Sequence, residues 1–290
     1  MLAATKMIVS LLKLRIGVAI AASALAGIAA AEGAFPSLPT VLALAIAVIG
    51  ASGAAGAFNH YYERDLDRLM VRTKSRPFAS GALKPGAIWP ISFLILLTLS
   101  LALATAVGGS LSAFFVFLGA FTYGIVYTVW LKRRSVWNIV IGGLAGSFAV
   151  LAGAAAVDTV PQLNAWILAV VLFLWTPPHF WSLAAAKGDD YKSAGVPMLP
   201  IVVSERAWTM AVLTHTAALV VISMVPLFYG SGLLYGLGAG IGGGIFLWKS
   251  WELYRAPSKK TAMANFFASL QQLLLLVAGV TAEAVVGPIL

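Results

Sequence analysis

The chain has 290 residues, of which 61% are hydrophobic and only 10% are charged, and its mean hydropathy is +0.95. Soluble domains carry about 25% charged residues, so this composition excludes an ordinary soluble protein. The chain has no cysteine, which excludes disulfides, thiolate metal sites and cysteine nucleophiles. A formal net charge of +9 would suggest nucleic-acid binding in a soluble protein, but here the placement of the charges gives it another origin.

Hydropathy windows of about 20 residues, the length that crosses a bilayer core, predict nine transmembrane helices. These stretches lack the period-two alternation of barrel strands, so the expected class is an all-α integral membrane protein. No linker or low-complexity segment interrupts them, and we expect one domain over residues 1–290. The predicted spans are 12–31, 38–58, 88–107, 111–131, 136–157, 163–185, 207–228, 231–249 and 264–287.

All 19 Lys and Arg residues lie in alternate connections: at or before the start of the first span, and after the second, fourth, sixth and eighth spans. The other connections and the C-terminus carry only Glu32, Asp158 and Glu283. The positive-inside rule then places the N-terminus in the cytoplasm and the C-terminus outside. We therefore expect an inner-membrane protein whose chemistry takes place on its cytoplasmic side.

Two basic residues, Lys13 and Arg15, stand at the start of the first span. Two interpretations are open for them. Their long side chains can snorkel to the interface, or they can reach a phosphate-bearing ligand at the cytoplasmic face.

The connection after the second span carries Asn59, Glu63 and Asp67 at four-residue spacing. No helix breaker lies near residue 59, so the helix is expected to run on to about residue 67, which places the three side chains along one face. These oxygens suit Mg²⁺, which completes its shell with water and substrate phosphate. Basic residues around such a metal would neutralise a departing diphosphate. The basic residues that follow are Arg72, Lys74 and Arg76. The competing interpretation is a solvated loop with intrahelical ion pairs.

Tyr123, Tyr127 and Trp130 lie near Lys132, at the end of the fourth span, and are typical of an interfacial aromatic belt. Asn138, early in the fifth span, is a candidate pocket residue.

The end of the sixth span contains Pro177 and Pro178, which should kink the helix and free backbone carbonyls. His179 follows directly and is a functional candidate as an ionisable residue at the membrane edge, although a hydrogen-bonded packing role is equally open. Asp189 and Asp190 repeat the acidic theme on the same side of the membrane. Two acidic clusters with basic residues around them suit a bridged diphosphate better than either cluster alone.

These segments resemble the UbiA-type membrane prenyltransferase superfamily, whose mark is an Asn/Asp-x3-Asp-x3-Asp motif after the second of nine helices. Within it they are most similar to the haem-modifying branch, the haem O synthases. The resemblance covers roughly residues 10–290. Its matching segments are 59–67 with 70–77, 127–133, 138–143, 175–181 and 189–200.

The resemblance implies transfer of a farnesyl group from farnesyl diphosphate to a vinyl group of haem B, with Mg²⁺-assisted departure of diphosphate. It implies that Mg²⁺–diphosphate is held by Asn59, Glu63, Asp67 and Asp190, and that His179 contacts the haem. The full set of expected substrate-binding residues is Lys13, Arg15, Arg72, Lys74, Arg76, Lys132, Asn138, His179, Lys187, Asp189 and Tyr191. The expected partners are membrane lipid and a haem A synthase or terminal oxidase assembly, and no nucleic acid.

Some residues depart from the family pattern. Glu63 stands in place of the usual Asp, Ala186 in place of the first acid of a second Asp-x3-Asp motif, and Leu14 where Pro is expected. The segment after Gly146 lacks the family's proline pair, which leaves the acceptor more open than the diphosphate chemistry. The alternatives are a prenyltransferase acting on a quinone precursor or chlorin, a transporter and a structural assembly factor. A transporter would place its charged site near the bilayer midplane.

Overall fold

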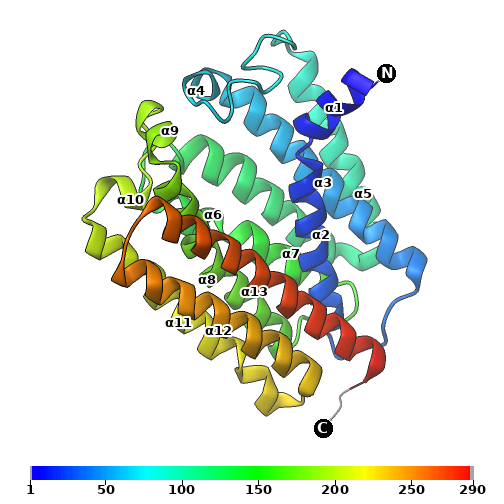
Figure 1. Cartoon of the computed structure of the whole chain (residues 1–290). Coiled ribbons are helices and arrows are strands. Elements are labelled where there is room, and N and C mark those ends of the chain that lie inside the picture. Colours follow the sequence, from blue (N-terminus) through cyan, green and yellow to red (C-terminus); the bar gives the residue numbers. More distant parts are fainter. Residues whose placement is uncertain (1, 288–290) are drawn as a thin grey trace.

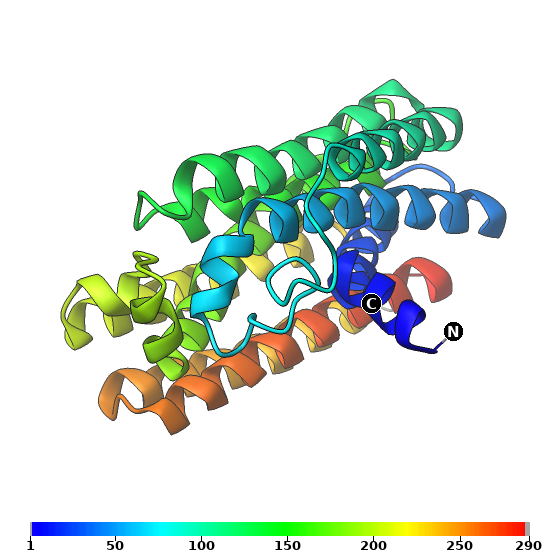
Figure 2. The ribbon, with the colours of Figure 1, turned by 90° about the horizontal axis from the view of Figure 1, so that it is seen from above.

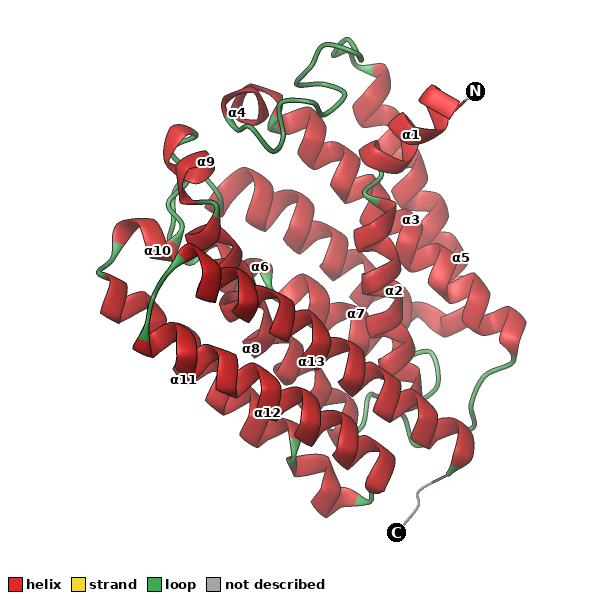
Figure 3. Cartoon of the chain, viewed as in Figure 1, coloured by secondary structure: helices red, strands yellow, loops and turns green. Residues whose placement is uncertain are grey.

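The computed structural model describes residues 2–287, and within this range the chain forms helices and loops and no strand (Figure 3). The longer helices are α2 (Leu14–Ala29), α3 (Leu38–Tyr62), α5 (Ile88–Phe121), α8 (Leu163–Ala186), α11 (Glu205–Ser223), α12 (Leu233–Arg255) and α13 (Lys259–Val286). The shorter elements are α1 (Leu2–Leu11), α4 (Arg64–Leu69), the π-helix η1 (Thr122–Leu131), α6 (Asn138–Gly142), α7 (Leu144–Ala154), α9 (Gly188–Ser193), α10 (Leu199–Val202) and the 3₁₀-helix η2 (Val225–Tyr229). The predicted all-helical class is confirmed.

The helices pack as a bundle, with α4, α9 and α10 at one end and the described C-terminal end of α13 at the other (Figure 1). Among residues 2–287, five helical segments are long and apolar enough to cross a membrane, and a sixth arises if residues 5–11 and α2, bent by 52°, are counted as one span. The chain is thus a multi-pass membrane protein. The count differs from the nine predicted spans partly because Ile88–Leu131 is one 44-residue helical segment by this test.

This long segment is broken at Gly109, where φ is 80° and ψ is 173°. A positive φ of this size favours glycine, which has no Cβ to clash with the backbone. Before the break, Trp89 packs edge-on against Phe78, and after it Lys132 contacts Glu63. Both ends of the segment therefore lie at the α3–α4 end of the bundle, so the chain reverses at Gly109 and the two arms correspond to the predicted windows 88–107 and 111–131.

Glycines bring α2 and α7 into backbone contact. A Cβ on Gly27 would lie 1.9 Å from the carbonyl oxygen of Val150, and one on Gly153 would lie 1.8 Å from that of Ala24. Any larger residue would force the helices apart, as at other close helix crossings in membranes. The contact fixes α2, whose first turn follows Lys13, against the centre of the bundle.

The helix expected to run from the second span to about residue 67 is interrupted at Glu63, where φ is −92° and ψ is 12°. The spacing survives the break, because the Glu63 amide donates to the Asn59 carbonyl (2.9 Å) and the Asp67 amide donates to the Glu63 carbonyl (2.8 Å). Figure 2 looks down on this end and shows α4 and the loop after it lying across the bundle. In contrast, α8 remains one helix through Pro177 and Pro178.

Candidate active site

The α3–α4 junction turns three polar side chains into the protein. Asn59, Glu63 and Asp67 are 2%, 0% and 1% exposed. Burial of two carboxylates without partners would be very costly, since an isolated charge loses its hydration in a low-dielectric interior. The interpretation of this segment as a solvated loop is therefore wrong for Glu63 and Asp67, whose negative charges need a compensating partner inside the protein.

Each buried carboxylate faces a cation from another part of the chain. Lys132 Nζ contacts Glu63 Oε2, and one guanidinium nitrogen of Arg76 lies 2.8 and 2.9 Å from the two oxygens of Asp67. Burial lowers the pKa of Lys132, while Glu63 beside it acts in the opposite direction. A third cation, Lys13, donates to Asn59 Oδ1 at 2.6 Å. The predicted acidic motif thus lies inside a cluster of mixed charge.

Lys13 reaches this cluster from an unusual backbone position between α1 and α2. Its φ is 48°, in the left-handed region that non-glycine residues seldom occupy. Its Nζ also donates to Tyr123 Oη at 2.6 Å, and its stem packs against Gly56. Lys13 therefore turns into the protein and does not snorkel to the interface. The side chain of Arg15 is exposed, as in the snorkelling interpretation.

The interpretation of the fourth-span tyrosines as an interfacial belt is wrong for two of the three aromatic residues. Tyr123 and Tyr127 stack on each other at 5.9 Å and face the cluster, with Lys13 and Lys132 over their respective rings at 5.3 and 5.7 Å. Trp130 is 50% exposed, as a belt residue should be. Both tyrosines belong to the π-helix η1, and their four-residue separation puts them on one face of it, which is turned toward the cluster.

The structure joins the two predicted constellations through Asp190. Its carboxylate accepts hydrogen bonds from the backbone amides of Val71 (3.1 Å) and Arg72 (3.3 Å), and Ser193 Oγ donates to the Leu69 carbonyl at 3.1 Å. Helix α9 is therefore attached to the loop that follows α4. Next to Asp190, Tyr191 is buried; burial raises the pKa of its phenol, and Arg72 acts in the opposite direction.

Several predicted substrate-binding residues lie outside the buried cluster. Asp189 has an 85% exposed side chain and pairs with Lys259 at 3.0 Å. Asn138 is fully buried and donates to the carbonyls of Ser135 and Pro197, so it holds a loop. The predicted basic residues with exposed side chains are Arg15, Arg72, Lys74 and Lys187.

His179 is also separate from the cluster. It is 7% exposed and packs between Trp175 of its own helix and Phe266 of α13, with Ser269 at its Nδ1. No sequence pattern points to Ser269, because a lone serine in an apolar span has no motif around it.

The oxygen donors fit a hard divalent cation in type, although residues 2–287 contain no group of three or more His, Asp or Glu side chains gathered around one point. Glu63 Oε1 is buried and has no hydrogen-bond partner. Its other oxygen and the Asp67 carboxylate are held by cations that can also bind phosphate. The residues present therefore fit a site in which metal and anion are bound together.

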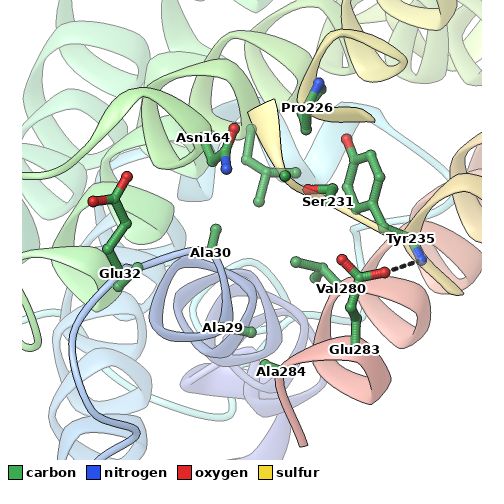
Figure 4. A pocket seen from close by; sticks show the side chains of 13 residues that line it. Ala29, Ala30, Glu32, Asn164, Pro226, Ser231, Tyr235, Val280, Glu283 and Ala284 are labelled. Carbon is green, nitrogen blue, oxygen red and sulfur yellow. Dashed lines mark hydrogen bonds between the residues drawn. The ribbon is translucent and has the colours of Figure 1, made fainter. Parts of the chain in front are cut away.

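A hollow of about 220 Å³, lined among others by Asn164, Tyr235 and Glu283 (Figure 4), lies away from the α3–α4 junction. Glu283 in its wall accepts hydrogen bonds from the backbone amides of Gly232 and Tyr235, at the start of α12. This carboxylate therefore caps a helix.

The chain belongs to the UbiA prenyltransferase family, whose model matches residues 20–271. It is 56% identical over 98% of both chains to protoheme IX farnesyltransferase 2 of Paramagnetospirillum magneticum, and 37% identical to protoheme IX farnesyltransferase of Hyphomonas neptunium, over 96% of this chain and 92% of that one.

Solved structures share the fold. A structure of digeranylgeranylglyceryl phosphate synthase aligns with a TM-score of 0.79 at 18% identity, over 97% of this chain and 98% of that one. A UbiA homologue from Archaeoglobus fulgidus bound to GPP and Mg²⁺ aligns with a TM-score of 0.68 at 14% identity, over 94% and 99%.

Proposed function

We propose that this protein transfers the farnesyl group of farnesyl diphosphate to a vinyl group of haem B, giving haem O and diphosphate. The 56% identity to a protoheme IX farnesyltransferase over nearly the whole of both chains supports this choice of substrates. The structural observation that carries it is the buried cluster at the α3–α4 junction. Three cationic side chains there face two carboxylates, which leaves one formal positive charge for an anionic ligand. The cationic side chains are Lys13, Arg76 and Lys132.

We assign the metal to Asn59, Glu63, Asp67 and Asp190, with Mg²⁺ as the ion. When bound, Mg²⁺ would neutralise the charge that develops on the departing diphosphate. The unpartnered oxygen of Glu63 supports this assignment, because a buried carboxylate oxygen without a donor is costly unless a ligand completes it. Asp190 also fixes the loop that carries Arg72, through its bonds to two backbone amides.

Lys13, Arg76 and Lys132 have the chemistry to hold the diphosphate. Their present partners are an amide oxygen and two carboxylates. Each cation can therefore exchange an oxygen acceptor of the protein for a phosphate oxygen and keep a charge-assisted hydrogen bond. The exposed Arg72, Lys74 and Lys187 lie outside this shell. We assign them the weaker role of attracting the anionic substrates to the cytoplasmic face.

In the proposed reaction, the bond between C1 of the farnesyl group and the diphosphate oxygen breaks, and its electron pair leaves with the diphosphate. C1 then bonds to the terminal carbon of a haem vinyl group. The positive charge on the adjacent vinyl carbon is captured by water, which loses a proton to give a hydroxyl group. An apolar bundle interior keeps water from the allylic cation before the carbon–carbon bond has formed.

We also propose nine membrane crossings of a single domain over residues 1–290 in the inner membrane, with the N-terminus in the cytoplasm. The alternate placement of all 19 basic residues and the reversal at Gly109 support this topology. Because the chain has no cysteine, single-cysteine variants test it cleanly. A membrane-impermeant maleimide should label Ser231→Cys in intact cells and Ser75→Cys only after the membrane is opened. The reverse pattern would invert the topology.

An acceptor panel tests the function. Purified protein in detergent receives farnesyl diphosphate and Mg²⁺ with haem B, with a quinone precursor or with a chlorin, and the products are identified by mass spectrometry. We expect product with haem B alone. Prenylation of the quinone precursor or the chlorin but not of haem B would show that the acceptor is not haem, and that the protein is a prenyltransferase of the alternative kind. We propose a haem A synthase or terminal oxidase assembly as the recipient of the product.

A further inference from the structure

His179 is held in a stack of aromatic rings. The Trp175 ring lies 4.2 Å from the imidazole at an interplanar angle of 19°, and the Phe266 ring lies 4.5 Å away at 29°. Phe180 contacts it edge-on at 5.0 Å. Because both faces of the imidazole are covered, a ligand can reach only its edge.

The hydrogen bonds of Ser269 determine which ring nitrogen carries the proton. The single hydroxyl hydrogen of Ser269 is donated to the Phe266 carbonyl, with an O–O distance of 2.6 Å. In the 2.7 Å contact with His179 Nδ1, Ser269 Oγ must then be the acceptor and Nδ1 the donor. In a neutral imidazole with hydrogen on Nδ1, the lone pair belongs to Nε2.

That lone pair is not used inside the protein. No hydrogen bond joins Nε2 to any residue in the range 2–287, although His179 is only 7% exposed. Nε2 is also not among the fully enclosed polar atoms that lack a partner, so it retains surface that a ligand can touch. A second bond stiffens the arrangement, since Trp175 Nε1 donates to the Ser269 carbonyl at 2.8 Å. Ser269 thus anchors both the imidazole and the ring stacked on it.

We propose that Ser269 is a positioning residue that presents Nε2 of His179 as an electron-pair donor, and that this nitrogen binds the iron of the haem substrate. The inference rests on the proposed function and names the atom through which the acceptor is held. Imidazole nitrogen is a common ligand of haem iron, and a ligating histidine usually donates its other N–H to an oxygen of the surrounding protein. The contact between Nδ1–H and Ser269 supplies that second bond, and the aromatic stack fixes the ring plane.

Haem B binding to purified full-length protein, without farnesyl diphosphate, tests the proposal. Dissociation constants come from absorption titration, and the iron–imidazole bond of the ferrous complex is observed by resonance Raman spectroscopy. His179→Ala should lose the iron–imidazole band, and free imidazole should restore it. Ser269→Ala should keep the band at lower frequency and weaken haem binding about tenfold, in the range found for residues that orient metal ligands. Ser269→Thr should retain the wild-type behaviour.

Ser223→Ala is the matched control. Ser223 is also a fully buried serine whose hydroxyl donates to the carbonyl three residues earlier (2.8 Å), but its hydroxyl oxygen has no contact with a histidine. Its haem affinity and spectrum should equal those of the wild type. Equal loss in both serine variants would make the Ser269 effect a general packing defect and overturn the positioning role.

The failures of the two proposals are distinguishable. If the wild type makes haem O but the His179→Ala complex keeps the iron–imidazole band, the ligation is wrong and the proposed function stands. If Ser269→Ala matches the wild type in affinity and band position, the positioning role is wrong. If folded wild-type protein neither binds haem B nor yields haem O, the proposed function falls and the inference falls with it.

Discussion

Alternate residues of one short segment lie in opposite environments. Glu63 and Asp67 are at most 1% exposed and pair with Lys132 and Arg76, whereas the side chain of Asp65 between them is 65% exposed and pairs with Arg133. All three acids have a basic partner. Ion pairing therefore does not distinguish the site from its surroundings, and burial does.

This difference has an energetic meaning. An exposed pair contributes about 0–1 kcal/mol and costs little to form. Taking two charges out of water costs several kcal/mol per ion, and an apolar pair of similar volume is often as stable. The buried pairs are thus poor devices for stability alone. Functional sites are where such arrangements cluster.

The largest effect expected from this comparison is on catalysis by Asp67. Asp67→Ala should lower turnover at least about a hundredfold, the scale for losing one group that stabilises developing charge. Insertion into the membrane should be retained. The matched control is Asp65→Ala, two residues away on the exposed face, which should keep most of the activity. Comparable turnover in the two variants would remove the metal-site assignment.

A large effect on stability is expected from Lys132. Lys132→Met leaves the fully buried Glu63 without its partner, at a cost of about 3–5 kcal/mol. Adding Glu63→Gln should recover most of that stability but no activity, because the buried charge is removed together with a proposed metal ligand. Unfolding of the detergent-solubilised protein measures the stability, and haem O formation measures the activity. Recovery of activity in the double variant would show that the pair is only structural.

A smaller and selective effect is expected at His179, outside the charged cluster. His179→Ala should raise the KM for haem B about tenfold, while the KM for farnesyl diphosphate changes little, because within residues 2–287 no hydrogen bond or ring contact joins His179 to the cluster. One lost interaction of about 1.4 kcal/mol corresponds to this factor. Steady-state kinetics with each substrate varied in turn provide the measurement. A change confined to farnesyl diphosphate would reverse the assignment.

The smallest effect concerns the exposed pair. The Arg133 guanidinium bonded to Asp65 lowers the pKa of that carboxyl from 3.8 to about 2. A lowered folded-state pKa stabilises the protein above the unfolded value, so the contribution is intact at neutral pH and is lost as the pH falls from about 4 to 2. Because Asp65 is largely exposed, Asp65→Asn should cost less than about 1 kcal/mol. The unfolding curves of wild type and Asp65→Asn should therefore differ slightly at neutral pH and coincide near pH 2. A larger loss, or one that persists in acid, would mean that Asp65 is more than a surface partner.

The sequence predicts much of this architecture because hydropathy and charge placement are strong signals in membrane proteins. The chain reversal within Ile88–Leu131 lies where the predicted windows 88–107 and 111–131 are separated, at Gly109. The spacing of Asn59, Glu63 and Asp67 survives as a common buried face. The nine-span count and the roles of the site residues stay predictions.

Other features depend on local geometry that periodicity does not carry. The belt interpretation of Tyr123 and Tyr127 rests on their nearness to Lys132 at the membrane edge, and nearness in sequence does not tell which side of the helix faces the bundle interior. The contact between His179 and Ser269 joins residues 90 positions apart. The left-handed backbone of Lys13, between α1 and α2, has no propensity signal in the sequence, and neither has the packing of its stem against Gly56 of α3.

The central claim is that the buried cluster at the α3–α4 junction activates a prenyl diphosphate with Mg²⁺ for transfer to haem. The most direct measurement is mass spectrometry of haem extracted from reactions of wild-type, Asp67→Ala and Asp65→Ala protein with haem B and farnesyl diphosphate, each with Mg²⁺ or with chelator. We predict haem O from the wild type and Asp65→Ala in Mg²⁺ only, and at least about a hundredfold less from Asp67→Ala. Undiminished haem O from Asp67→Ala, or none from folded wild type with Mg²⁺, would contradict the account.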